Sequence, residues 1–193
     1  MTIYEAINEG IKRVSDIDGN FIYASFSLSD GDYVVNSDFH VSKDGRELPV
    51  HGCKGNIYPE VTICGYPMKA YVLSMIAVDP LFVNEYLKGG VVVNHCVETM
   101  RDGGNHPHKD VWFNPAYLEV ISNGDNVRHG RFIKKYKLTD VYVSAKDIDD
   151  LKPMMFSLEG VEDEALVEEI KETNRSLVES YYRAKGLTKK LRF

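Results

Sequence analysis

Two pairs of polar residues in this chain have the types and spacing for metal-assisted hydrolysis. Asn94 and His95 come directly after a β-branched run at residues 91–93. Asn126 and His129 lie three positions apart, so on a helix their side chains face the same way and could point at one divalent cation. A neutral imidazole beside such an ion could take a proton from water. The four residues therefore form a candidate hydrolytic site.

The segment that carries these pairs predicts strand, loop, strand and short helix. Residues 91–93 and 118–122 predict the two strands, and a polar, Gly-rich loop connects them. Ser122 or Asn123 would cap a short helix, which Gly130 would end. A hairpin packed on a helix can hold one cation between a strand end and the helix, so this arrangement would position the site.

The first 80 residues predict a helix and then a small antiparallel β module. Thr2 and Glu5 have capping-box spacing. Apolar residues then recur on one helical face up to a break at Gly19, and these residues are Ile3, Ile7, Ile11 and Val14. Strand-like runs separated by turn residues follow at 21–28, 33–35 and 61–64. The apolar run at residues 69–78 fits either a helix or a buried strand.

The chain closes with a predicted helix over residues 161–185, which Gly186 would end. Its predicted apolar face consists of Leu166, Ile170, Leu177 and Tyr181. The whole pattern predicts an α+β fold in three parts: a helix and β module at 1–80, a hairpin-helix motif at 81–138 and a helical extension at 139–193.

Composition and cysteine usage indicate a cytoplasmic protein. No run of residues has the character of a secretory signal or a membrane-spanning helix, so no membrane partner is expected. Cys53, Cys64 and Cys96 form no Cys-x-x-Cys pair, which argues against a disulfide framework. Cys96, His106 and His108 could suggest zinc, but a single cysteine without a second ligand pair argues against a structural zinc site.

The formal net charge of −6 argues against a nucleic-acid partner, but the charge is unevenly spread. Residues 127–138 hold five bases and no acid, and residues 183–193 hold five more bases and no acid. Residues 139–172 carry 11 acids against 3 bases. Because the sign of the charge reverses locally, the total does not exclude nucleic acid.

Three blocks of the chain resemble the HNH (His-Me finger, ββα-metal) endonucleases of phages and mobile elements. The first block is Val93-Asn94-His95. Residues 114–122 are similar to the family's NPxHLE-x-V-T element, and residues 125–129 are similar to its EN-x-x-H element. Upstream, residues 39–46 resemble the start of the small β module that precedes the HNH motif in homing endonucleases, and residues 71–77 fall at that family's V-H-R-L-V-A element.

The resemblance implies a role for each matching residue. His95 would be the general base that deprotonates the attacking water, and Asn114 would hold the loop that orients it. Asn94 and Asn126 would hold one Mg²⁺ or Mn²⁺ ion, and His129 would be a further ligand or a phosphate contact. The reaction would leave 5′-phosphate and 3′-hydroxyl ends on double-stranded DNA.

The basic run after the predicted site is the expected DNA contact. Its residues would neutralise phosphates, and they are Arg128, Arg131, Lys134, Lys135 and Lys137. The C-terminal helix with its basic tail would add DNA contacts or form a homodimer interface. The resemblance also implies a phage-encoded protein that acts in the host cytoplasm.

Two alternatives from other functional classes stay open. All three expected metal ligands are neutral, whereas hard cations prefer anionic oxygen, so the chain could be a non-catalytic protein that keeps an HNH scaffold for DNA binding or for a structural role. The chain could also be an acidic adaptor whose predicted helix at residues 161–185 docks a protein partner.

Overall fold

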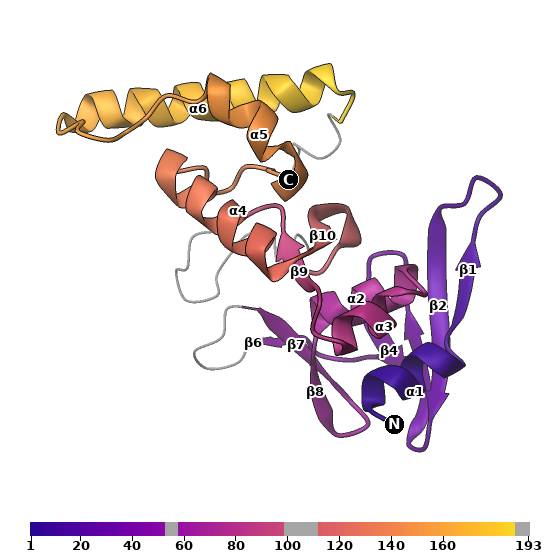
Figure 1. Cartoon of the computed structure of the whole chain (residues 1–193). Helices are drawn as coiled ribbons and strands as arrows, with labels where there is room; N and C mark the ends of the chain where they lie inside the picture. Colours follow the sequence, from indigo (N-terminus) through magenta and orange to yellow (C-terminus); the bar gives the residue numbers. More distant parts are fainter. Residues whose placement is uncertain (53–57, 99–111, 188–193) are drawn as a thin grey trace.

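The computed structural model describes residues 1–52, 58–98 and 112–187 and has an α+β fold (Figure 1). Its main sheet has five antiparallel strands in sequential order: β1 (Lys12–Ser15), β2 (Phe21–Leu28), β3 (Gly31–Val35), β4 (Val41–Lys43) and β5 (Arg46–Glu47). None of the described helices is long and apolar enough to cross a membrane. The predictions about Cys53, His106, His108 and the tail at 188–193 concern residues outside the described ranges.

Helix α1 (Ile3–Gly10) begins with the predicted capping box, in which the Thr2 hydroxyl accepts from the Glu5 N–H. The helix is shorter than the sequence predicts, and the expected continuation to Gly19 is wrong. Ile11 has an extended backbone, and the next residues form β1, which pairs antiparallel with β2. The apolar spacing fits a longer helix. The backbone N–H and C=O groups of residues 12–15 instead form hydrogen bonds with β2 at the edge of the sheet.

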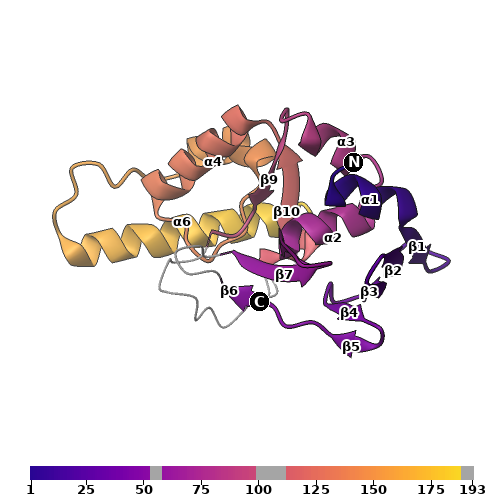
Figure 2. The ribbon, with the colours of Figure 1, turned by 90° about the horizontal axis from the view of Figure 1, so that it is seen from below.

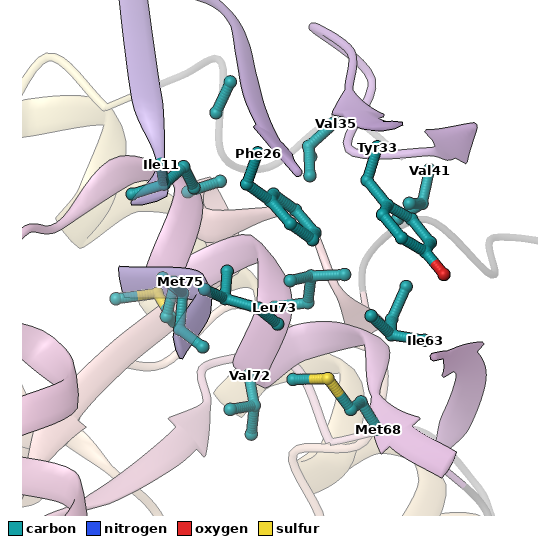
Figure 3. Packing of buried hydrophobic residues seen from close by; sticks show 14 of the residues in the cluster. Ile11, Phe26, Tyr33, Val35, Val41, Ile63, Met68, Val72, Leu73 and Met75 are labelled. Atoms are coloured by element: carbon teal, nitrogen blue, oxygen red, sulfur yellow. The ribbon is translucent and has the colours of Figure 1, made fainter. Parts of the chain in front are cut away.

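A second, three-stranded sheet and two helices complete the N-terminal part: β6 (His51–Gly52), β7 (Pro59–Ile63), β8 (Tyr66–Lys69), α2 (Ala70–Val78) and α3 (Phe82–Leu87). The ambiguous apolar run is therefore mainly helix. It is buried on nearly every side, because it lies inside the first hydrophobic core. Figure 3 shows this core, in which Leu73 of α2 lies near Phe26 of β2 and Val72 lies near Met68 of β8.

The central segment forms the predicted hairpin and helix. Strand β9 (Val92–His95) pairs antiparallel with β10 (Leu118–Ile121), and the 3₁₀ turn η2 (Pro115–Tyr117) leads into β10. Ser122 caps α4 (Asn123–Tyr136). The expected end at Gly130 is wrong, since α4 continues to Tyr136 because its last two turns bury apolar side chains in a second core.

The β9–β10 hairpin lies between the two cores. Neighbouring residues of a strand point to opposite faces. Leu118 and Val120 pack on the first core, whereas Ile121 packs on the second. The hairpin therefore joins the N-terminal part to the C-terminal part.

The C-terminal part consists of η3 (Ala145–Asp147), α5 (Ile148–Leu151), η4 (Lys152–Met154) and α6 (Glu164–Ala184). Helices α4 and α6 both contribute buried side chains to the second core and run obliquely to one another (Figures 1 and 2). The predicted apolar face of α6 is mostly not the buried one, because the buried residues are Asn174, Val178 and Tyr182, and of the predicted face only Tyr181 packs against the second core. Asn174 can be buried because its amide exchanges two hydrogen bonds with the backbone of Phe156 (2.8 and 3.0 Å).

Candidate functional site

His95 lies at the end of β9 in an aromatic pocket, and only 6% of its surface is exposed. Its ring stacks on Tyr58, with centroids 4.5 Å apart, and meets the ring of Tyr71 edge-on at 4.9 Å. Its Nε2 lies 3.0 Å from the carbonyl oxygen of Trp112. Three segments that are distant in the sequence thus hold this one imidazole.

The hydrogen bond determines which nitrogen of His95 carries the proton. A carbonyl oxygen can only accept, so neutral His95 donates its Nε2–H to Trp112 and keeps a lone pair on Nδ1. Burial lowers the pKa of His95 to about 4, the bond to Trp112 opposes this shift, and the charge of His129 adds to it. His95 is therefore neutral at pH 7, with Nδ1 as a proton acceptor.

Asn94 points to the opposite face of the hairpin and joins a buried polar group. Its Nδ2 donates to Oε1 of Glu119 at 2.8 Å, directly across the strand pair. The same carboxylate accepts from Ser144 Oγ (2.7 Å) and from the Ala145 N–H (2.6 Å). A carboxylate oxygen accepts, so the amide nitrogen of Asn94 must face Glu119, and its Oδ1 points elsewhere.

His129 is fully buried in the second turn of α4. Its Nε2 lies 2.8 Å from the carbonyl oxygen of Val143, so the neutral ring carries its proton there. Its buried Nδ1 has no hydrogen-bond partner within the described part of the chain. Burial lowers the pKa of His129, against the opposing effects of the Val143 bond and the charges of Glu119 and Glu98. His129 thus interacts electrostatically with Glu119 and with His95, and its described hydrogen bond is the one to Val143.

The structure does not bring all the predicted site residues into one group. His95 belongs to the aromatic pocket and Asn94 to the polar group on the other face of the hairpin, whereas His129 interacts electrostatically with both His95 and Glu119. Across residues 1–52, 58–98 and 112–187, no group of three His, Cys, Asp or Glu side chains is placed to hold a metal ion.

Asn114 and Asn126 hold local backbone structure. Asn114 Oδ1 accepts from the Ala116 N–H (2.9 Å) and caps η2, while Trp112 is the residue bonded to His95. Asn126 is half-exposed in the first turn of α4. Within the described ranges, no hydrogen bond joins either asparagine to His95 or to the polar group.

The basic run at residues 127–138 contains one cation that forms ion pairs and four that line a surface depression. Arg128 forms ion pairs with Asp149 (3.0 Å) and Asp125 (3.4 Å). The other four cations are exposed and line a depression of about 520 Å³ together with Ser157, Leu158 and Glu159; they are Arg131, Lys134, Lys135 and Lys137. A surface of this charge could bind a polyanion.

Several residues of this region carry no distinctive signal in the sequence. Glu119 is the glutamate of the block at residues 114–122 that resembles the HNH element, but that resemblance gave it no role, and its strand pattern does not indicate a buried carboxylate with three donors. Tyr58 and Tyr71 come from the N-terminal part, and only the packing of this part against the hairpin brings them to His95. Trp112 contributes its backbone carbonyl, which no side-chain pattern indicates.

No model of a known protein family matches this chain, and no curated protein or solved structure matches it either.

Proposed function

We propose that the chain is a metal-dependent endonuclease of the HNH type that hydrolyses phosphodiester bonds in DNA, with His95 as the general base. The proposal rests on the protonation and hydrogen bonding of His95. Its Nε2–H is donated to the Trp112 carbonyl, its Nδ1 holds a lone pair, and its pKa of about 4 keeps it neutral at pH 7. A general base needs this protonation state and a fixed ring orientation.

The order of elements supports the same proposal. Strand β9, strand β10 and helix α4 follow one another as hairpin and helix, which is the order that the resemblance to HNH endonucleases implies. His95 ends the first strand and His129 lies on the helix, at the positions where that resemblance places the base and a metal ligand.

Asn94 and His129 offer atoms that suit a divalent cation. His129 donates Nε2–H to a main-chain carbonyl and keeps an unpartnered Nδ1 lone pair, which is the usual arrangement of a ligating histidine. Glu119 accepts a hydrogen bond from Nδ2 of Asn94, so the Oδ1 atom of Asn94 is not used in that bond. Asn94, His129 and Asn126 would hold Mg²⁺ or Mn²⁺, which would stabilise negative charge on the scissile phosphate.

The DNA would extend over the basic depression beside α4. Arg131, Lys134, Lys135 and Lys137 would neutralise its phosphates, whereas Arg128 is already paired with acids of the same chain.

The test of the proposed function is conversion of a supercoiled plasmid to the nicked or linear form in the presence of Mg²⁺ or Mn²⁺. Activity that His95→Ala removes supports it, and equal cleavage by both proteins would refute it.

A second candidate is a DNA-binding protein that keeps this scaffold without catalysis. The burial of the site favours it, because the exposed fractions of Asn94, His95 and His129 are 2%, 6% and 0%. Calorimetry with Mn²⁺ distinguishes the two candidates. Binding that Asn94→Ala and His129→Ala both abolish favours the nuclease, whereas DNA binding without any Mn²⁺ binding favours the scaffold protein.

A further inference from the structure

We infer that α6 pairs with α6 of a second copy of this chain in antiparallel orientation. The outward face of α6 carries a seam at Leu166, Ile170, Thr173 and Leu177. The successive spacings of four, three and four residues are those of the apolar positions in a two-helix coiled coil. The seam therefore has the sequence period of a helix that contacts another helix.

This seam is separate from the face that α6 buries against its own chain. The buried face consists of Asn174, Val178 and Tyr182. At 3.6 residues per turn, the two faces are centred roughly 110° apart. Figure 1 shows α6 along the edge of the molecule, with the other helices approaching it from one side. The face with Asn174, Val178 and Tyr182 thus packs within its own chain, and the seam lies outside that contact.

The apolar side chains of the seam lack the packing of a core position. Leu166 is 44% exposed, and Ile170 and Leu177 are half-buried. None of the three belongs to either hydrophobic cluster of the described residues or to the side chains packed against them. Beside the seam, a hollow of about 370 Å³ runs along α6 where Thr173 and Ser176 are small. A partner helix could place its side chains there.

The charges on α6 favour the antiparallel orientation with a second copy. Residues 162–172 hold six acids and one base. A parallel pair would set this acidic segment against the same segment of its partner. An antiparallel pair sets it beside residues 171–181 of the partner, which hold two acids and two bases. The antiparallel orientation therefore reduces the repulsion between the two acidic segments, and the opposed helix dipoles are also favourable.

The antiparallel register follows from the seam. In an antiparallel coiled coil, each a position of one helix faces a d position of the other. Leu166 of one copy therefore faces Leu177 of the other, and Ile170 faces Thr173. Two Leu–Leu layers then flank a centre of Ile and Thr. The seam is short, so pairing should depend on protein concentration. This inference does not rest on the proposed nuclease activity.

Light scattering over a range of protein concentrations tests the pairing. The wild-type mass should rise from 21.9 kDa toward twice that value as the concentration increases. Leu166→Glu and Leu177→Glu should each stay near 21.9 kDa with unchanged helix content by circular dichroism. Ala165→Glu places the same charge on another face of α6 and should behave like the wild type. A wild type that is monomeric throughout, or Glu variants that still dimerise, would overturn the inference.

Cysteine cross-linking tests the orientation. A mixture of Leu166→Cys and Leu177→Cys proteins should form a disulfide-linked dimer under mild oxidation, well above the background of the wild type with its own three cysteines. Each variant alone should stay close to that background. Efficient cross-linking of Leu166→Cys to itself would indicate a parallel pair and overturn the antiparallel arrangement.

Discussion

The side-chain amide of Asn94 donates a 2.8 Å hydrogen bond to the buried carboxylate of Glu119, its direct partner across the β9–β10 hairpin. Ser144 and Ala145 donate to the same carboxylate from the segment that follows α4. Glu119 therefore ties the hairpin to the C-terminal part of the chain and fixes the amide of Asn94. A buried carboxylate thus lies next to Asn94, one of the proposed metal ligands, and orients its amide.

Glu119→Ala should destabilise the fold, because it leaves three buried donors without their acceptor. Unsatisfied buried polar groups cost about 1–3 kcal/mol each, and partial relaxation should leave a loss of about 3 kcal/mol in the free energy of unfolding. Urea denaturation measures this loss. Glu159→Ala is the matched control, since Glu159 is exposed and should change stability by less than about 0.5 kcal/mol. Equal effects of the two variants would contradict the role of Glu119.

His95 should make the stability of the fold depend on pH. Burial lowers its folded-state pKa to about 4, whereas the unfolded value is about 6.5. Between these values the unfolded chain binds the extra proton, so the contribution is complete above pH 6.5 and is lost as the pH falls toward 4. This loss is about 3 kcal/mol over the window.

Urea denaturation at pH 7 and pH 4.5 measures the effect of His95. The wild type should lose more stability between these pH values than His95→Phe, which keeps an aromatic ring between Tyr58 and Tyr71 but cannot be protonated. Burial also lowers the pKa of His129, so His95→Phe should keep part of the pH dependence. The same loss in both proteins would show that His95 is not held neutral by burial.

The basic depression predicts a contrast between two sets of cations. Replacing Lys134 and Lys135 by Gln should lower DNA affinity and reduce the slope of log K against log salt by about 2, because each phosphate contact contributes about 0.9. Arg128→Gln should have little effect, since Asp149 and Asp125 already neutralise Arg128. Fluorescence anisotropy at several salt concentrations measures both slopes. A larger effect from Arg128→Gln would place the DNA elsewhere.

Local signals in the sequence were sufficient to predict several secondary-structure elements and helix caps. The turn at residues 29–32 separates two strongly strand-like runs, and β2 spans Phe21–Leu28 as expected. The capping box at Thr2 and the cap at Ser122 are both present. Such features depend on side chains within a few residues of one another, so the sequence alone can indicate them.

Features decided by tertiary packing could not be predicted in the same way. Gly130 looks like a helix end, but Phe132 and Ile133 bury α4 in the second core and carry the helix past it. Spacing favoured Leu166 as part of the buried face of α6, whereas the structure buries Asn174 because a distant backbone segment satisfies its amide. The pocket around His95 likewise depends on residues that only the fold brings together.

Plasmid cleavage by His95→Ala, with His40→Ala as the matched control, tests the central claim most directly. His40 is a partly exposed histidine that contacts Glu47 (3.0 Å) and meets the ring of Phe113 edge-on, with centroids 5.5 Å apart. With Mn²⁺ present, wild type and His40→Ala should nick supercoiled plasmid at similar rates, whereas His95→Ala should be slower by at least about 100-fold. Cleavage by His95→Ala at the wild-type rate, or no cleavage by the folded wild type, would contradict the assignment of His95 as the general base.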